Sequence, residues 1–295
     1  MISGSGCLAR RRVITRKGGQ ATQTLLTANK QTLITQLADR YQAIQSISAT
    51  VDMVPALGSA NKGKITEYKD VRAYLLFRKP SDIRLIGLFP VVRNKAFDMV
   101  SNGSRFQVYI PAKNRFIEGR NGMDKPSVNK LENLRPQHFQ DALIIQPVST
   151  ATERTLLENF TDEENAAYIV EVLHTDENGE LWLQRQIWFE RLALNVARQI
   201  LFDRNGDILT DARYGEWQIY DGVAFPKRVD INRPKDEYGV VMTMVKMDIN
   251  KPLADDKFKL ERPEGTELHT LGEKPELAPA PVSPRQSDRK GNKKK

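Results

Sequence analysis

The sequence predicts a mainly β protein of the α+β class, built on one long and strongly curved antiparallel sheet. Two observations lead to this class. Dipeptides of Asn or Asp followed by Gly, which accept the positive φ angles of a two-residue hairpin turn, recur along the chain; they begin at Asn102, Asn121, Asn178, Asn205 and Asp221. Strand-like runs lie between these turns, and segments with helical periodicity are few. Successive hairpins indicate a meander.

Two segments have the periodicity of a helix. The first spans residues 24–47 and places an apolar stripe along one side: Leu26, Leu33, Leu37, Tyr41 and Ile44. The second spans residues 135–145, with Pro136 in its first turn and Phe139 and Leu143 on one side. Two helices are little cover for the apolar face of so long a sheet. We therefore expect a curved sheet that holds both helices on its concave face and leaves apolar space beside them.

Nine stretches of the sequence are expected to be strands. Alternation places Phe106, Val108 and Ile110 on one face of their strand. It also places Ile187 with the other apolar residues of its strand, although Arg185 interrupts that face. The expected strands span residues 71–79, 82–89, 95–101, 105–112, 166–175, 181–190, 197–203, 216–221 and 239–249.

The excess of basic residues lies at the two ends of the chain. The formal net charge is +8, but residues 1–19 carry five basic groups and residues 285–295 carry six. The body between them is close to neutral, which argues against specific nucleic-acid binding. We expect an anchor segment and basic linker over residues 1–20, one folded domain over residues 21–270 and a Pro-rich, basic, unfolded tail over residues 271–295. No run reaches the roughly 18 apolar residues of a membrane-spanning helix.

No arrangement of residues in the sequence indicates catalysis. The histidines His138, His174 and His269 are far apart, and each has a structural explanation: a helix surface, a strand end and the border of the tail. The motifs of serine hydrolases, zinc proteases, P-loop proteins and dinucleotide-binding proteins are absent. Residues 203–207 resemble a calcium loop but lack its ligand spacing, so a hairpin turn explains them better. The sequence predicts no enzyme, no cofactor and no metal site.

The order and spacing of the expected elements resemble a known family. The matching pieces are the first helix, a turn at Lys79-Pro80, the strand segment Ile83-Arg84-Leu85, the hairpin Ser101-Asn102-Gly103 and the stretch FKLERPEG at residues 258–265. Over residues 25–268 this pattern is similar to the carrier and receptor proteins of the outer-membrane lipoprotein localisation (Lol) pathway and their lipoprotein-sorting relatives. The resemblance implies an incomplete antiparallel β-barrel, wrapped over lid helices around an apolar cavity that holds acyl chains.

This resemblance implies a set of cavity-lining residues. An acyl chain gains about 0.8 kcal/mol for each methylene group that leaves water, so such a cavity needs apolar side chains and no directed hydrogen bonds. For each single residue, packing in a closed core is the alternative. The expected lining residues are Leu33, Leu37, Tyr41, Leu75, Phe77, Leu85, Phe106, Val108, Ile110, Phe139, Leu143, Ile187 and Phe189.

A lone cysteine near the start of the chain fits the same family. Cys7 follows Ser5 and Gly6, and small residues precede the lipidated cysteine of bacterial lipoproteins. Gly4 stands where leucine is usual, and no apolar segment precedes it, so a signal peptide is expected upstream of Met1. We expect Cys7 to be lipidated, which would anchor the protein in a membrane.

An apolar tip is expected between two strands. Leu88, Phe89 and Val91 surround Pro90 at the position of the apolar loop tip of the family's membrane-anchored receptor, although the residues differ. We expect them to contact a membrane; a buried strand end is the alternative.

Together these observations predict a non-catalytic lipoprotein on the periplasmic face of the cell envelope of a diderm bacterium, anchored to the outer membrane. Its expected partners are the acyl chains of a lipid or lipoprotein, the outer-membrane surface and an envelope carrier protein, with the protein itself a monomer. The alternative is an envelope scaffold of the same fold with a closed core and no lipid cargo.

Overall fold

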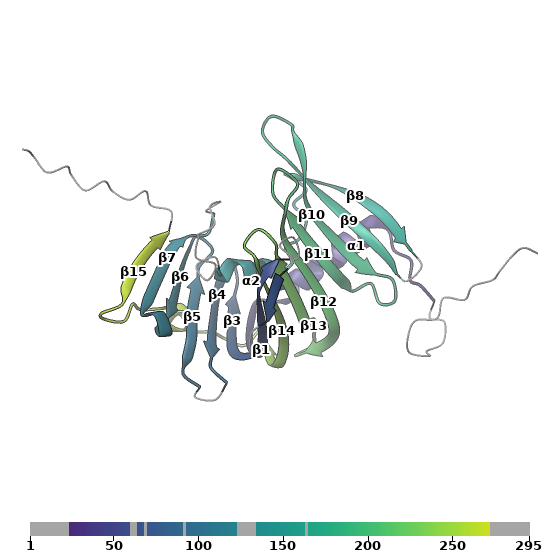
Figure 1. Ribbon diagram of the computed structural model, residues 1–295. Helices are drawn as coiled ribbons and strands as arrows, with labels where there is room; N and C mark the ends of the chain where they lie inside the picture. Colours follow the sequence, from purple (N-terminus) through teal and green to yellow (C-terminus); the bar gives the residue numbers. More distant parts are fainter. Residues whose placement is uncertain are drawn as a thin grey trace, which may run out of the picture.

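The protein folds around one continuous, curved β-sheet. A computed structural model describes residues 24–59, 64–67, 70–90, 93–122, 134–162 and 165–271. Within these residues 15 strands join into one sheet, and two α-helices lie against it (Figure 1). The sheet runs from β15 at one edge to β8 at the other, and these two edge strands do not pair with each other. This confirms the predicted class, a mainly β α+β fold with an incomplete antiparallel β-barrel.

The elements have the following bounds. The helices are α1 (Lys30–Ala43) and α2 (Pro136–Leu143), with short 3₁₀ turns η2 (Pro111–Lys113) and η4 (Asp255–Phe258). The strands are β1 (Ser46–Ser59), β2 (Lys64–Glu67), β3 (Val71–Arg78), β4 (Asp82–Leu88), β5 (Lys95–Ser101), β6 (Arg105–Ile110), β7 (Arg115–Arg120), β8 (Glu153–Thr161), β9 (Ala166–Thr175), β10 (Leu181–Glu190), β11 (Val196–Phe202), β12 (Ile208–Tyr220), β13 (Val223–Arg233), β14 (Tyr238–Ile249) and β15 (Glu267–Leu271).

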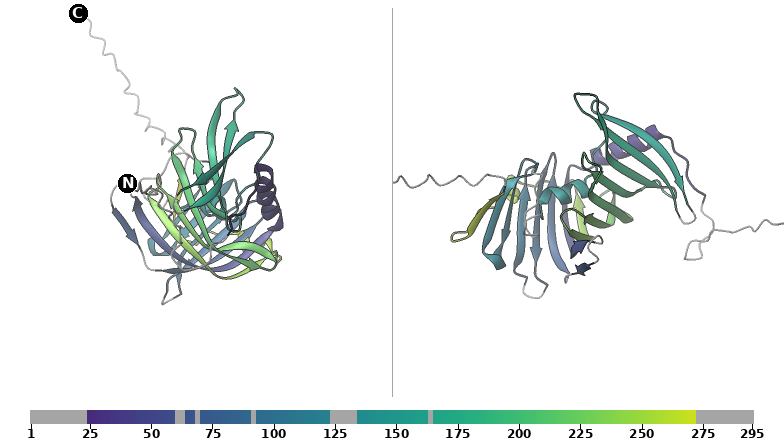
Figure 2. Two further views of the ribbon diagram at one scale, coloured as in Figure 1. Left: turned by 90° about the vertical axis from the view of Figure 1, so that its right-hand side faces the viewer. Right: turned by 45° about the horizontal axis from the view of Figure 1, so that its top comes forward.

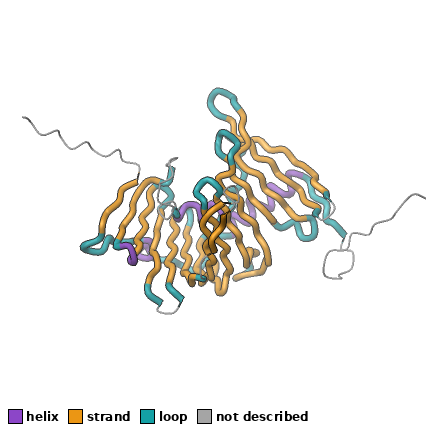
Figure 3. Tube along the Cα trace, viewed as in Figure 1, coloured by secondary structure: helices purple, strands orange, loops and turns teal. Residues whose placement is uncertain are grey.

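The strand order is two meanders joined in the middle. It reads β15-β7-β6-β5-β4-β3-β1-β14-β13-β12-β11-β10-β9-β8, with β2 paired to β1 beside this path. Strands β1 and β14, which are far apart in sequence, form the joint by pairing along their length, from Ile47 opposite Ile249 to Leu57 opposite Tyr238. The sheet bends, with one arm on each side of this joint (Figures 2 and 3). One arm runs from β3 to β15 and the other from β13 to β8.

The meander prediction is confirmed within each arm and wrong at two places. The β1–β14 pair joins distant segments, and β15 pairs with β7 in parallel. The two-residue turn predicted at Asp221 is present, since both Asp221 and Gly222 have positive φ, 46° and 83°. The dipeptide at Asn121 closes no hairpin, because it follows β7 and the next described strand of the chain, β8, lies at the opposite edge of the sheet.

Helix α1 is shorter than predicted. Asn29 caps its first turn, accepting a hydrogen bond from the Thr32 backbone N–H at 2.8 Å. The helix ends at Ala43, and Ile44 is already extended because the chain enters β1 at Ser46. The apolar stripe therefore starts inside the helix, and Leu26, predicted to belong to it, lies before the helix and is 43% exposed.

Both helices pack on the concave face of the sheet. Helix α1 contacts β13, and α2 lies between the two arms, contacting β4 and β5 on one side and β12 on the other. Side chains of both helices belong to the single large cluster of buried apolar residues on this face. The outer face is crossed by the segment that follows β14: Arg78 and Arg84 donate to the carbonyl oxygens of Leu253 and Lys257, both at 2.9 Å. This outer crossing delivers β15 to the edge beside β7.

Substitutions at Leu75 and Tyr74 show which face of the sheet contributes more to the free energy of unfolding. Leu75 of β3 is fully buried on the concave face, and its neighbour Tyr74 is 45% exposed on the other. Leu75→Ala is expected to lower the free energy of unfolding by about 2–5 kcal/mol, because it leaves a cavity in the core. Tyr74→Ala should cost less than about 1 kcal/mol. Urea denaturation of both variants checks this, and equal losses would contradict the assignment of the two faces.

Candidate functional site

An apolar groove opens where α1, the end of α2 and the floor of the sheet meet. Its cavity volume is about 40 Å³, enough for a few methylene groups but not for a whole acyl chain. Four parts of the chain line it: α1, the residues that end and follow α2, the start of β11, and the β12–β13 hairpin. The lining residues are Leu37, Arg40, Tyr41, Ile44, Leu143, Ile144, Ile145, Val196, Tyr214, Trp217, Ala224, Phe225 and Pro226.

One side of α1 forms a wall of the groove. Arg40 and Tyr41 lie three and four residues after Leu37, so all three share this side of α1, and Ile44, directly after the helix, continues the wall. Leu37 and Ile44 are buried, and Tyr41 is partly buried against the apolar cluster. The end of the wall is fixed to the sheet, because Lys79 Nζ donates to the Tyr41 carbonyl oxygen at 2.6 Å.

The floor of the groove depends on a kink in β12. Strict alternation would place Tyr214 and Trp217, three residues apart, on opposite faces of the sheet. Glu216 between them has a φ of 55°, in the left-handed region, which interrupts the alternation. Both aromatic side chains therefore line the same groove. Trp217 is fixed there by a hydrogen bond from its Nε1 to the Val196 carbonyl oxygen at 3.2 Å.

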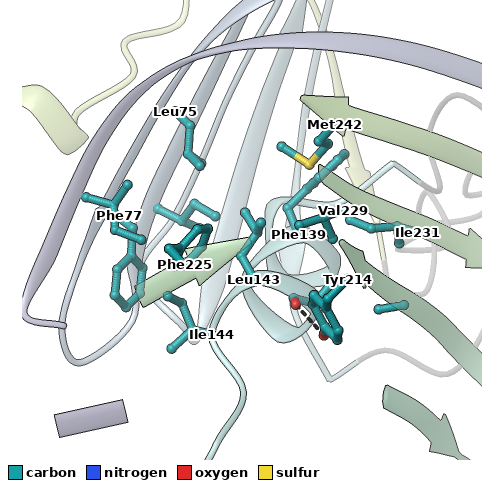
Figure 4. Packing of buried hydrophobic residues seen from close by; sticks show 14 of the residues in the cluster. Leu75, Phe77, Phe139, Leu143, Ile144, Tyr214, Phe225, Val229, Ile231 and Met242 are labelled. Atoms are coloured by element: carbon teal, nitrogen blue, oxygen red, sulfur yellow. Dashed lines mark hydrogen bonds between the residues drawn. The ribbon is translucent and has the colours of Figure 1, made fainter. Parts of the chain in front are cut away.

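The end of α2 forms the opposite wall. Leu143 lies between Phe225 and Tyr214 in Figure 4, and all three side chains line the groove. The hydroxyl of Tyr214 donates to the Ala142 carbonyl oxygen at 2.6 Å, satisfying an acceptor at the helix end. Burial raises the pKa of Tyr214, so this hydroxyl keeps its proton and remains a donor.

The segment after α2 is held by a buried arginine. Arg185 of β10 donates to the carbonyl oxygens of Gln146 and Pro147 at 2.6 and 2.9 Å and pairs with Glu153 at 3.2 Å. These contacts explain why Arg185 interrupts the apolar face of its strand. Its side chain makes hydrogen bonds and an ion pair that fix the chain segment beside the groove.

A polar cluster lies at the other end of α2. His138, expected on a helix surface, lies on α2, and its Nδ1 is 2.7 Å from the hydroxyl of Tyr238 in β14, so it contacts the sheet. The pKa of His138 is lowered well below its ordinary value, first by burial and then by Arg233 of β13 and Arg135 before the helix. Burial raises the pKa of Asp141 on the same helix, whose carboxylate accepts from Gln137. The contact of His138 with Tyr238 therefore ties the start of α2 to β14.

Arg40 is a charged residue on the apolar wall of the groove. Its guanidinium lies 4.8 Å from the ring centre of Trp217, and Nη2 donates to Asn195 Oδ1 at 2.7 Å. Its pKa is lowered by burial, an effect that the nearby charge of Glu190 opposes. Nη1 is buried and, among the residues that the structure describes, has no hydrogen-bond partner.

The predicted cavity-lining residues lie together on the concave side, and most of that surface is filled by packing. All thirteen belong to, or pack against, one apolar cluster, and all except Tyr41 and Ile110 are buried. Three of them, Leu37, Tyr41 and Leu143, line the groove. Phe106 instead reaches a separate polar hollow of about 440 Å³ beside β6 and β7.

The rest of the groove was not predicted from the sequence. The missed residues are Arg40, Ile44 as a groove residue, Ile144, Ile145, Val196, Tyr214, Trp217, Ala224, Phe225 and Pro226. Two signals were available. Arg40 lies three residues after Leu37 and four before Ile44, on the apolar stripe itself, and Ile144-Ile145 is an apolar pair directly after a helix.

The predicted membrane-contact residues lie at the β4–β5 connection. Leu88 ends β4 and is partly buried, while Phe89 is 41% exposed. Its backbone N–H donates to the Asn94 carbonyl oxygen at 2.9 Å, which closes the turn. Val91 and Cys7 lie outside the described residues.

The described residues contain no group of three metal-ligating side chains, and no helix among them is long and apolar enough to cross a membrane. The turn predicted at residues 203–207 is confirmed, because the Asp203 carboxylate accepts from the backbone N–H groups of Asn205 and Asp207, both at 2.9 Å.

Comparison with known proteins identifies the fold. No family model matches the sequence, and no curated protein matches it. Among solved structures, a LolA superfamily protein from Nitrosomonas europaea is similar over 79% of this chain and 99% of its own, with a TM-score of 0.50 and 14% identity. A DUF1329 family protein from Desulfovibrio piger is similar over 77% of this chain and 95% of its own, with a TM-score of 0.52 and 17% identity.

The chain has the LolA-type fold. The resemblance predicted from the sequence is therefore confirmed at the level of architecture. In this LolA-type fold the concave face carries both helices, and the groove lies where they meet it.

His138 makes the stability of this LolA-type fold depend on pH. Its lowered pKa means that the unfolded chain takes up a proton near pH 6.5 whereas the folded protein does not. The free energy of unfolding should therefore fall as the pH drops below about 6.5, by about 1 kcal/mol from this group between pH 7.5 and 5.5. The raised pKa of Asp141 acts in the opposite direction, since the folded state then holds that proton more tightly.

The variant His138→Gln isolates this contribution, because glutamine retains a hydrogen bond to Tyr238 but does not titrate. Urea denaturation of both proteins at pH 7.5 and 5.5 should show a drop in unfolding free energy that is about 1 kcal/mol smaller in the variant. An unchanged pH dependence would show that the pKa of His138 is the same in the folded and the unfolded state.

Proposed function

We propose that this protein binds an acyl chain of a lipid or lipoprotein between its two helices and the concave face of the sheet, and carries or receives it at the outer membrane of a diderm bacterium without catalysing a reaction. The observation that carries the proposal is the groove: an opening lined mainly by apolar side chains from both helices and the sheet, continuous with the large apolar cluster.

The energetics favour such a ligand. Each methylene group moved from water into the groove contributes about 0.8 kcal/mol, so a long chain offsets the cost of association without a specific motif. The groove as it stands takes only a few methylene groups, so a whole chain requires the helices to move outward. The apolar contacts that they give up are then replaced by contacts with the ligand.

The attachments of the helices fit such a movement. Polar contacts hold the helices to the rest of the chain at separate points: Lys79 donates to the Tyr41 carbonyl oxygen near the end of α1, Gln36 in the middle of α1 donates to the Leu194 carbonyl oxygen at 3.2 Å, and Gln199 donates to the Asp141 carbonyl oxygen of α2 at 3.0 Å. Elsewhere α1 and α2 face the sheet with apolar side chains, whose contacts are not directional. The helices can therefore separate from the sheet by exchanging one apolar surface for another.

A closed scaffold is the second candidate, and one observation favours it. Most of the expected lining residues are buried by the protein's own side chains, which is how a core without cargo would look. Lipid extraction separates the two candidates: protein purified without detergent from a diderm host is extracted with organic solvent and analysed by mass spectrometry. Bound acyl lipid near one per protein supports the carrier, and absence of lipid, with no uptake when lipid is offered, supports the scaffold.

Filling the groove should block binding. Ala224→Leu adds apolar bulk at a lining position, and we expect at least a fivefold loss of affinity for a fluorescent twelve-carbon fatty acid, measured by titration. The matched control Ala112→Leu adds the same bulk at an exposed position in η2 and should leave the affinity unchanged. Thermal melts must show both variants folded, since overpacking costs typically about 1–3 kcal/mol. Equal affinities of both variants and the wild type would place the ligand elsewhere.

We further propose that the tip at Leu88, Phe89 and Val91 contacts the membrane during transfer. Phe89 supports this because a large apolar side chain is 41% exposed at a turn. Phe89→Glu is expected to slow transfer of a labelled lipid to vesicles several-fold while the melting temperature stays the same. Loss of the fold in this variant would instead show that Phe89 is part of the core.

Lipidation of Cys7 would supply the membrane anchor in this proposal. Metabolic labelling with palmitate in the native host should mark the protein, and the label should be lost in Cys7→Ser. An unlabelled protein in the membrane fraction would contradict this part of the proposal.

A further inference from the structure

The apolar wall of the groove contains one unsatisfied charged donor. Arg40 lies on the same side of α1 as Leu37, and its ring contact with Trp217 at 4.8 Å positions the guanidinium at the groove. A guanidinium carries five N–H donors. Nη2 donates to Asn195, whereas Nη1 is buried and has no acceptor within the part of the chain that the structure describes.

The acidic side chain whose charge acts on Arg40, Glu190, does not satisfy this donor. Glu190 raises the pKa of Arg40 through its charge, but no ion pair within 4.0 Å joins the two side chains. The carboxylate oxygens of Glu190 accept from the backbone N–H groups of Leu192 and Ala193 at 2.7 and 3.1 Å, and again from that of Asn195. Glu190 is therefore occupied in closing the β10–β11 turn.

An unpartnered buried donor is costly, and more so when it is charged. An anionic acceptor at Nη1 would remove this cost and form a charge-assisted hydrogen bond. A second cation lies at the same end of α1: Lys79 Nζ is 3.8 Å from the ring centre of Tyr41, another groove residue. The groove thus combines apolar walls with positive charge at one end.

We propose that the ligand of this groove is a single-chain amphiphile whose anionic head group, a carboxylate or a phosphate, binds Arg40 while its chain extends between Leu37, Leu143 and Phe225. The inference rests on the proposed function and names the class of ligand. A groove of about 40 Å³ has to open less for one chain than for several, and one free donor position fits one head group. A neutral head group would leave Nη1 unsatisfied, and a cationic one would be repelled.

The test compares ligands that share one chain and differ in the head. Decanoate, decyl phosphate and decanol are titrated into the full chain at pH 7.5 and low salt by isothermal titration calorimetry. We expect at least one of the two anions to bind about tenfold or more tightly than decanol, and the comparison of the anions identifies the head group. In Arg40→Met this preference should disappear while decanol binds as before. Arg40→Lys should keep part of it.

A control variant tests whether losing any arginine changes the binding preference, and a salt titration tests whether the preference depends on charge. Arg204→Met removes an arginine that also lies over a tryptophan ring, Trp182 at 5.0 Å, but does not line the groove, and it should retain the full preference. In the wild type, added salt should weaken binding of the anions and not of decanol. Equal binding of anions and decanol would overturn the inference and leave the proposed function standing, whereas no binding of any of the three would contradict both.

Discussion

The packing of α2 between the two arms of the sheet is the interaction on which the rest of the structure depends. A sheet of this length has an apolar inner face far larger than two short helices can cover, and water must be kept from it. Helix α2 covers part of this apolar face by contacting β4 and β5 in one arm and β12 in the other, so that both arms share one core. Where α2 ends, its cover stops, and the groove begins at Leu143 and Ile144.

The polar groups of this region lie at the borders of the apolar core, and their hydrogen bonds fix the parts of the chain that surround the groove. Tyr214 and His138 tie the two ends of α2 to different strands, and Arg185 ties the segment that follows it. Each of these contacts satisfies a group that would otherwise be buried without a partner, so each favours the closed arrangement. At the groove itself, Nη1 of Arg40 is buried and has no acceptor among the described residues. The apolar walls and this donor are the features on which the proposed binding site rests.

The sequence predicted the class of the fold and much of each arm, but only a small part of the groove. Hairpin turns and alternation are local signals, and strands such as β5, β9 and β10 have the predicted bounds. The β1–β14 joint has no local signal, since its partners are about two hundred residues apart, and at β15 the sequence predicted only the end of the folded domain, without a strand. Among groove residues only Leu37, Tyr41 and Leu143 were predicted. Trp217 could not be, because the kink at Glu216 brings it to the face of Tyr214, and Arg40 was overlooked because a charged side chain is usually assigned to the outer side of a helix.

If an acyl chain enters between the helices and the floor of the sheet, Trp217 reports on its binding directly. Of the three tryptophans only Trp217 lines the groove; Trp182 and Trp188 pack elsewhere, against His174 and Phe160. A fatty acid that carries bromine on its chain quenches a tryptophan only on contact. In the variant Trp182→Phe/Trp188→Phe, which retains Trp217 alone, such a fatty acid should quench the fluorescence in a saturable manner. No quenching of Trp217, with quenching of the other two in Trp217→Phe, would contradict the account.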